Sequence, residues 1–266
     1  MSTPDPAEDG VVATYYKAPL ASRAVCSITA FVYLASLILV PGLPYGMMCC
    51  PLKVAQLQVW RLILAPLATP SLIGVLIGIF VFVQIGFMFE RKYGSLGFAY
   101  LFFLFGAVAN VLFSVAAILL APMAPGAGFL SQASCAGGLW GSMLAFLVVQ
   151  TQRSTQPTTS FWGMCNIPTK LYPLFLVVLF SLLGSPILEN LCALLAGYLF
   201  HHGYLSRFLP KGSTFTSWEA NPNLNMLTSA PGYLTWTGEV FAVASDEGAL
   251  GNWGSSQSGQ SQSRSG

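Results

Sequence analysis

The chain contains 60 consecutive residues, from Tyr93 to Gln152, without a single Asp, Glu, Lys or Arg. On insertion scales a charge near the centre of a bilayer costs at least about 2.5–3.5 kcal/mol, whereas soluble domains carry charges throughout their sequence. Charged residues make up 8% of the chain and hydrophobic residues 55%. The sequence therefore predicts an integral membrane protein, and its net charge of +2 is too small to indicate a nucleic-acid partner.

Six apolar runs are candidates to cross the membrane, since a spanning helix needs about 20 predominantly apolar residues. They fall at roughly 24–40, 71–89, 96–121, 130–150, 171–184 and 187–205. The fifth run is short, and the turn sequence Gly184-Ser185-Pro186 separates it from the sixth. We expect an all-α bundle of six transmembrane helices.

The basic residues indicate how this bundle is oriented. If the six runs alternate across the membrane, nine of the 11 Lys and Arg residues fall on the side of the N-terminus. The other two, Lys53 and Arg61, lie in the first loop. Because cytoplasmic loops carry an excess of Lys and Arg, both termini are expected in the cytoplasm. No cleavable signal peptide is evident, so we expect the first run to be an uncleaved anchor.

Composition divides the chain into four segments. Residues 1–20 are a cytoplasmic N-terminal segment, and 21–207 form the transmembrane domain. Residues 208–247 form a cytoplasmic tail of mixed polarity without a sustained helical period. Residues 248–266 are mostly Gly, Ser and Gln and are expected to be disordered.

Small residues four positions apart occur in three of the runs, and such steps let membrane helices approach closely. The pairs are Gly74 and Gly78, Gly137 and Gly141, and Ala193 and Gly197. The fourth and sixth runs are therefore candidates to lie against each other, although generic bundle contacts would give the same pattern.

The six cysteines have neither zinc-site spacing nor the pattern of a small secreted disulfide framework. They are Cys26, Cys49, Cys50, Cys135, Cys165 and Cys192. Since most lie in or beside apolar runs, we expect buried free thiols, no metal and no cofactor. Lipidation or pairing is the alternative for Cys49 and Cys50, which lie in a loop.

Four motifs follow the order and spacing of the rhomboid superfamily, which the chain resembles over about residues 15–207. They are Trp60-Arg61 after the first loop, Glu90-x-x-x-Gly94 after the second run, Ser134-Cys135-Ala136-Gly137 at the fourth run, and Asn190 with Ala193 and Gly197 in the sixth. The resemblance implies that Glu90 ties its loop to neighbouring helices. We expect Trp60 and Arg61 to anchor the first loop at the membrane interface.

The catalytic positions of rhomboid proteases are vacant in this sequence. Their serine nucleophile and histidine base correspond to Ala136 and Asn190. Alanine has no nucleophilic atom, and an asparagine amide does not accept a hydroxyl proton as an imidazole does. The chain therefore resembles a rhomboid pseudoprotease, not an enzyme. A non-standard serine protease using Ser142 and His201 is the alternative, although no Asp occurs between residues 10 and 245 to orient the base.

Within the superfamily, the segments 16–20, 58–63 and 89–95 are similar to the rhomboid-like ubiquitin-associated-domain-containing protein 2 family, which is related to derlins. This resemblance implies an adaptor in endoplasmic-reticulum-associated degradation. Its partners would be membrane-protein clients, a ubiquitin ligase, a UBX-domain protein and the AAA segregase. We detect no ubiquitin-associated domain in residues 208–247.

Four polar residues are the candidate binding site: Gln132, Ser134, Glu189 and Asn190. They are expected to form a lumen-side cavity that holds a client helix with a polar residue. A carboxylate inside a membrane is a functional candidate by default, and an interfacial Glu189 in contact with water is the alternative. A transporter or channel and a membrane-shaping, lipid-sensing structural protein are the other functions considered.

Overall fold

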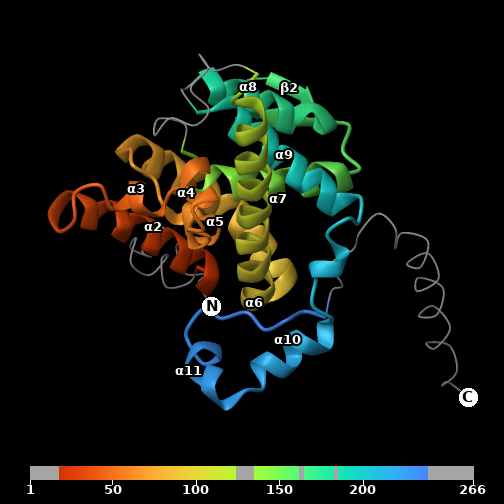
Figure 1. The fold of residues 1–266 in the computed structure, drawn as a ribbon. Coiled ribbons are helices and arrows are strands. Elements are labelled where there is room, and N and C mark those ends of the chain that lie inside the picture. The colour runs from red at the N-terminus through yellow and green to blue at the C-terminus, as the bar shows by residue number, and fades with distance from the viewer. Residues whose placement is uncertain (1–17, 124–134, 162–164, 183–184, 239–266) are drawn as a thin grey trace, which may run out of the picture.

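The structure, a computed structural model, describes residues 18–123, 135–161, 165–182 and 185–238. The described chain is mostly helical (Figure 1). Its principal helices are α2 (Leu20–Ile38), α6 (Leu72–Leu120), α7 (Trp140–Arg153), α8 (Tyr172–Leu182) and α9 (Ile187–His201). The loop between α2 and α6 contains three short helices, which are α3 (Leu43–Met47), α4 (Pro51–Ala55) and α5 (Trp60–Leu64).

Helix α6 consists of two helical halves that meet at Gly94. This residue has φ +74° and ψ 167°, a backbone conformation that glycine adopts readily and that residues with a side chain rarely adopt. The rings of Phe82 and Phe102 lie 5.5 Å apart, although 20 residues of straight helix would separate them by about 30 Å. The chain therefore folds back at Gly94, which lies between the predicted runs 71–89 and 96–121, and the two halves pack against each other.

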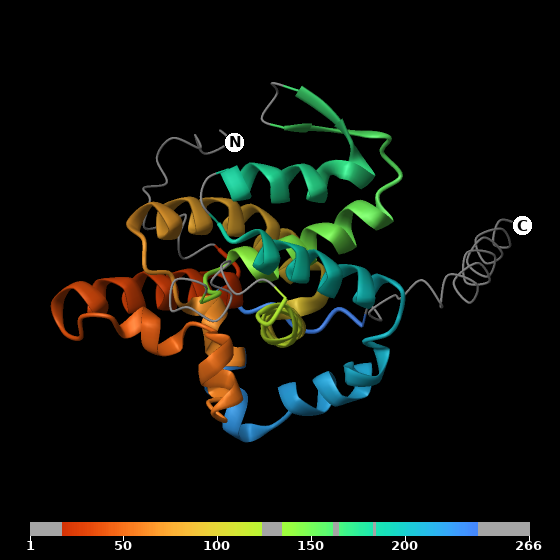
Figure 2. The ribbon, with the colours of Figure 1, turned by 45° about the horizontal axis from the view of Figure 1, so that its top comes forward.

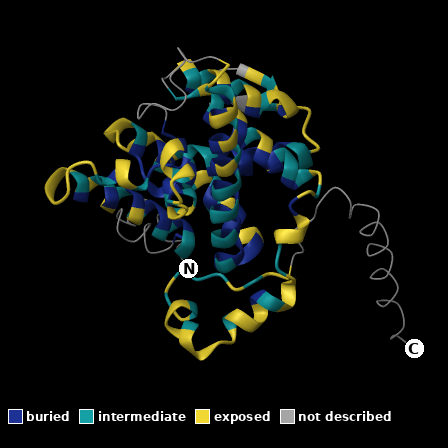
Figure 3. Ribbon diagram, in the orientation of Figure 1, coloured by how far each residue is buried: buried dark blue, intermediate teal, exposed yellow. Residues whose placement is uncertain are grey.

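Two of the described helices, α2 and α6, are long and apolar enough to cross a membrane by length and composition. The apolar helices α8 and α9 are shorter, and α7 has 14 residues. Large apolar side chains such as Phe31, Leu37, Ile73 and Phe80 are exposed on α2 and the first half of α6 (Figure 3). An extended apolar surface of this kind is typical of contact with lipid. The count of six spans stays a prediction.

One two-stranded antiparallel sheet interrupts the helices between α7 and α8. Strand β1 (Thr158–Phe161) pairs with β2 (Cys165–Pro168), and Thr158 lies opposite Pro168 (Figure 2). The expectation of an all-α fold is wrong in this detail. The β-branched Thr158 and Thr159 favour extended backbone. So short a hairpin leaves the pattern of apolar runs unchanged, and that pattern therefore did not predict it.

The core of the bundle is aromatic and is centred on α7. The ring of Phe146, which is fully buried, lies 4.7 Å from that of Phe89 and 4.8 Å from that of Phe105. Phe105 in turn meets Phe200 of α9 at 5.0 Å. Tilted and edge-to-face pairs of this kind contribute beyond simple burial of area. They fix α6 and α9 around α7.

The tail after α9 packs back onto the bundle (Figure 1). It forms α10 (Gly212–Glu219) and α11 (Asn225–Thr228) and then runs extended to residue 238. Phe215 is fully buried, stacks on Trp236 at 4.6 Å and belongs to the main hydrophobic core. The described part of the tail thus packs on the bundle, and the boundary at residue 208 stays a prediction. The predicted disordered segment 248–266 lies outside the described residues.

Glu90 joins the start of α2 to the turn in α6. Its carboxylate accepts hydrogen bonds from the backbone N–H groups of Ala21 and Ser22, both at 2.7 Å, and from Ser95 Oγ at 2.6 Å. The backbone N–H of Ser95 donates to the carbonyl of Leu234 at 2.8 Å, so the tail contacts the same turn. Three donors satisfy this buried carboxylate within the fold.

Candidate functional site

Ala136 lies where the loop between α2 and α6 meets the chain that leads into α7. Its backbone N–H donates to the Cys49 carbonyl at 2.9 Å, and the Cys49 N–H donates to the Ala136 carbonyl at 2.8 Å. Both residues are fully buried, in a small cluster with Ala65, Phe113 and Cys192. At the position that the resemblance assigns to a rhomboid nucleophile, the side chain is thus a methyl group. The backbone N–H and carbonyl of this residue both take part in hydrogen bonds within the protein.

The next two backbone amides are also occupied. Gly137 donates to Glu189 Oε1 at 3.1 Å, and Gly138 donates to the Ala65 carbonyl at 2.9 Å. An oxyanion hole consists of preorganised donors aimed at the place where negative charge develops. The N–H groups of residues 136–138 instead point at acceptors within the protein.

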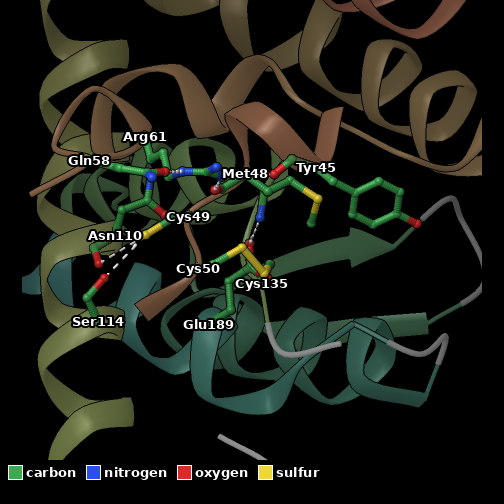
Figure 4. Close-up of a disulfide and its surroundings, with 11 residues drawn as sticks. Tyr45, Met48, Cys49, Cys50, Gln58, Arg61, Asn110, Ser114, Cys135 and Glu189 are labelled. Carbon is green, nitrogen blue, oxygen red and sulfur yellow. Dashed lines mark hydrogen bonds between the residues drawn. A yellow bond between two sulfur atoms is a disulfide. The ribbon is translucent and has the colours of Figure 1, made fainter. Parts of the chain in front are cut away.

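A disulfide joins Cys50 to Cys135 beside this bridge (Figure 4). The expectation that these two cysteines are free thiols is wrong. Pairing of the preceding Cys49 with Ala136 brings the two chains together, so that the Cα atoms of Cys50 and Cys135 lie 4.3 Å apart. The two cysteines are 85 positions apart in the sequence. Cys26, Cys49 and Cys192 are free and buried, as expected.

Arg61 cross-links the loop between α2 and α6 internally. Its guanidinium donates to the Tyr45 and Met48 carbonyls at 2.8 Å and to Gln58 Oε1 at 2.7 Å (Figure 4). The guanidinium is therefore a buried cross-link of the loop, while the indole of the neighbouring Trp60 is 52% exposed.

Two polar residues of α6, which the sequence reading missed, also fasten this loop. Asn110 Nδ2 donates to the Leu62 carbonyl at 3.0 Å, and Ser114 Oγ lies 3.3 Å from the sulfur of Cys49. Burial raises the pKa of the Cys49 thiol to about 11. Polar side chains inside an otherwise apolar run were the available signal, because such groups are costly in lipid without partners.

The candidate binding residues divide into two groups. Glu189 is buried in the first turn of α9 and reaches across to the amide of Gly137. Asn190 is fully buried, but its Nδ2 donates to Ser185 Oγ at 3.1 Å, in the turn before its own helix. The structure thus brings Glu189, and not the side chain of Asn190, to the start of α7. Gln132 and Ser134 lie outside the described residues.

Two hollows meet at Glu189. The first is a cavity of about 10 Å³, roughly the space of one water molecule, lined in part by Asn110, Gly137, Ser142 and Glu189. The second is an open cleft of about 270 Å³ between the start of α6 and α8. It is lined by Met48, Ile73, Ile77, Trp140, Phe180 and Glu189, among others. Across the ranges that the structure describes, His, Cys, Asp and Glu form no group of three that could hold a metal.

The serine of the alternative protease site, Ser142, uses its hydroxyl in a hydrogen bond to a backbone carbonyl. Ser142 is fully buried, and its hydroxyl donates to the Phe102 carbonyl at 3.2 Å. His201 lies in the last turn of α9, whereas Glu189 lies in the first turn of the same helix.

The small-residue steps lie at close helix contacts. A Cβ added to Gly197 would lie 2.7 Å from Val148 Cβ and 2.8 Å from the Ala145 carbonyl oxygen, so α9 approaches the backbone of α7 here. A Cβ added at Gly141 would lie 3.9 Å from Ala193 Cβ, and one added at Gly78 would lie 3.6 Å from Leu139. A Cβ added at Gly74 would lie 2.9 Å from Thr69, and one added at Gly137 would lie 2.7 Å from the Ala68 carbonyl oxygen, so these two glycines approach the loop before α6.

The helical bundle, its extended exposed apolar surface and the 60-residue stretch without a charged residue define a helical integral membrane protein. The family described as "Eukaryotic integral membrane protein (DUF1751)" matches residues 23–228, and the chain belongs to this family. It is also similar to Rhomboid-like protein 15 of Arabidopsis thaliana, with 28% identity over 227 residues. That match covers 83% of this chain and 55% of the relative, so the chain spans little more than half the relative's length. Both matches support a rhomboid-like protein, and membership of the derlin-related group stays a prediction.

Proposed function

We propose that the chain is a catalytically inactive, rhomboid-like adaptor in endoplasmic-reticulum quality control. The observation that carries the loss of catalysis is the occupancy of the backbone amides of residues 136–138, together with the methyl side chain of Ala136. A serine protease needs both a nucleophile and free donors for the oxyanion. At this position the chain offers neither.

The proposed topology has six spans and both termini in the cytoplasm. Because the disulfide joins Cys50 to Cys135, the chain between these residues has to cross the membrane an even number of times. The reversal of α6 at Gly94 accounts for two crossings. The charge-poor side, which carries the disulfide, would then be the endoplasmic-reticulum lumen, whose oxidising conditions favour such bonds.

The cleft beside Glu189 is the proposed client site. It opens sideways between the start of α6 and α8, where exposed Ile73 and the partly exposed Ile77 face the surrounding lipid. A transmembrane segment of a client could enter from the bilayer and place a polar residue next to Glu189. The ubiquitin ligase, the UBX-domain protein and the AAA segregase are partners by family resemblance.

Restoring the protease side chains tests the loss of catalysis. We expect that the double variant Ala136→Ser/Asn190→His neither reacts with a fluorophosphonate probe nor cleaves a model transmembrane substrate, because the amides at 136–138 stay occupied. The control is an active rhomboid protease in the same detergent. Cleavage by the double variant, or labelling of the wild type that is lost in Ser142→Ala, would contradict this part of the proposal.

Affinity capture of the full chain in mild detergent tests the adaptor role. We expect a ubiquitin ligase and segregase components in the eluate, and their absence from a matched capture with an unrelated multi-span protein of the same membrane. An eluate without either component, from membranes in which the bait carries its Cys50–Cys135 disulfide, would count against an adaptor.

A further inference from the structure

The bundle buries two carboxylates that differ in how far they are satisfied. Glu90 receives three hydrogen bonds, two from backbone N–H groups and one from a hydroxyl. Glu189 receives one from within the described residues, from the amide of Gly137. A carboxylate has about four lone-pair sites. With respect to the described residues, Glu189 therefore keeps most of its accepting capacity, even though only 9% of its surface is exposed.

Among the residues that the structure describes, no cation forms an ion pair with Glu189. Arg61, the buried cation of the neighbouring loop, already donates to Tyr45, Met48 and Gln58. Lys53, the other basic residue of that loop, is exposed on α4. A buried carboxylate without a cationic partner is unfavourable in a medium of low dielectric constant, and a partner that brings a positive charge removes this cost.

We infer that Glu189 recognises a basic side chain on a transmembrane helix that enters the cleft between the start of α6 and α8. This inference rests on the client-binding function proposed above and specifies the class of client. A Lys or Arg within an apolar helix is itself costly in hydrocarbon. Pairing with Glu189 satisfies the charge of both partners, while Ile73, Ile77 and Phe180 offer apolar contact to the rest of the helix.

The location of Glu189 restricts where the basic residue lies. Glu189 is in the first turn of α9 and contacts the residue that follows the Ala136 bridge. A matching helix would carry its Lys or Arg one or two turns inside the membrane from the end that lies on the disulfide side. A basic residue at the opposite end of the helix would not reach the carboxylate.

The test uses the full chain in its native membrane with a photo-crosslinking amino acid in place of Ile77, which lines the cleft. The probes are co-expressed single-span Leu/Ala helices that carry Lys, Gln or Glu two turns from the disulfide-side end, and one that carries Lys at the opposite end. We expect the first Lys probe to crosslink about tenfold more than the others, since couplings measured for close charge pairs across an interface correspond to at least that factor.

Substitution at Glu189 supplies the second arm. Glu189→Gln keeps the hydrogen-bond acceptor and should lower crosslinking of the Lys probe to that of the Gln probe, while Glu189→Lys should shift the preference to the Glu probe. Formation of the Cys50–Cys135 disulfide, seen on a non-reducing gel, reports native folding of each variant. The comparison of probes in the wild type needs no variant at position 189.

The possible outcomes separate this inference from the function on which it rests. If all probes crosslink equally and Glu189→Gln changes nothing, client helices bind but charge does not select them, and the inference is overturned. If the crosslinking residue at position 77 labels only lipid in folded protein that retains Glu189, the client site itself is refuted.

Discussion

The contact between α7 and α9 gives two glycine substitutions opposite expected effects. In Gly197→Ala the new Cβ would lie 2.7 Å from Val148 Cβ, 2.8 Å from the Ala145 carbonyl oxygen and 3.1 Å from Ala145 Cα. Two of these three neighbours are backbone atoms, so no rotamer change relieves the overlap and the helices have to separate. In Gly141→Ala the nearest atom, Ala193 Cβ, is 3.9 Å away, which is ordinary van der Waals contact.

The magnitudes follow from overpacking and helix propensity. Overpacking a well-filled core costs about 1–3 kcal/mol, and we place Gly197→Ala at the upper end because backbone atoms are involved. Alanine regains about 1 kcal/mol of helix propensity over glycine. The expected net loss in the free energy of unfolding is therefore about 2 kcal/mol for Gly197→Ala, or about 30-fold in the equilibrium constant. Gly141→Ala should be neutral or up to about 1 kcal/mol more stable.

The assay is alkylation of the buried Cys192 during an SDS titration in detergent micelles, followed for its own peptide by mass spectrometry. Cys192 is on α9, is buried in a cluster with Phe113 of α6 and Ala136, and becomes reactive when α9 leaves the bundle. Both variants carry one added methyl group in the same interface, so each controls for the other. The reasoning is refuted if Gly197→Ala unfolds within 0.5 kcal/mol of the wild type, a margin of about the experimental error, or if the two substitutions have the same sign.

Three further predictions concern the two ends of the bundle. Glu90→Gln should lower the free energy of unfolding by about 2 kcal/mol in the same titration, because charge-assisted bonds to two backbone amides and Ser95 are weakened; an unchanged midpoint would contradict this role. Phe215→Ala should cost about 3–5 kcal/mol of tail packing and make residues 206–238 sensitive to limited proteolysis, whereas equal cleavage of both proteins would show that the tail is not packed. Because burial raises the Cys49 pKa from 9.0 to about 11, the unfolded state loses this proton first, and stability should fall as pH rises through this range. Cys49→Ala should fall less steeply, and identical pH profiles would argue against a buried neutral thiol.

Charge and hydropathy along the sequence were sufficient for the class of protein and for the reversal in α6. The cost of charge in lipid acts on every residue of a span, so its effect is visible in the composition of a long segment. The glycine that permits the reversal, Gly94, also stood out in the motif Glu90-x-x-x-Gly94. The packing of the tail is not visible in the sequence pattern. Phe215 and Trp236 contact the bundle as single aromatic residues within segments that lack a helical hydrophobic period.

The disulfide and the orientation of Glu189 depend on long-range geometry that spacing does not encode. With six cysteines the sequence allows many pairings, and the choice of Cys50 with Cys135 follows from the backbone bridge between Cys49 and Ala136. The resemblance to rhomboid proteases directed attention to Asn190 as the expected position of the base. The rotation of α9 instead presents Glu189 to the start of α7 and leaves Asn190 to its own turn.

The contacts that we propose prevent hydrolysis also suit the region for binding. The Cys49–Ala136 bridge and the Cys50–Cys135 disulfide fix the loop to the chain that leads into α7, and Arg61 cross-links the loop internally. In an enzyme, donors held this way would have to be released before they could stabilise an oxyanion. In a binding site, a wall that is already rigid loses little conformational entropy when a ligand arrives. A fixed cleft and the absence of a nucleophile at position 136 are therefore compatible, and introducing Ser and His alone would leave the loop, and with it the occupied amides, unchanged.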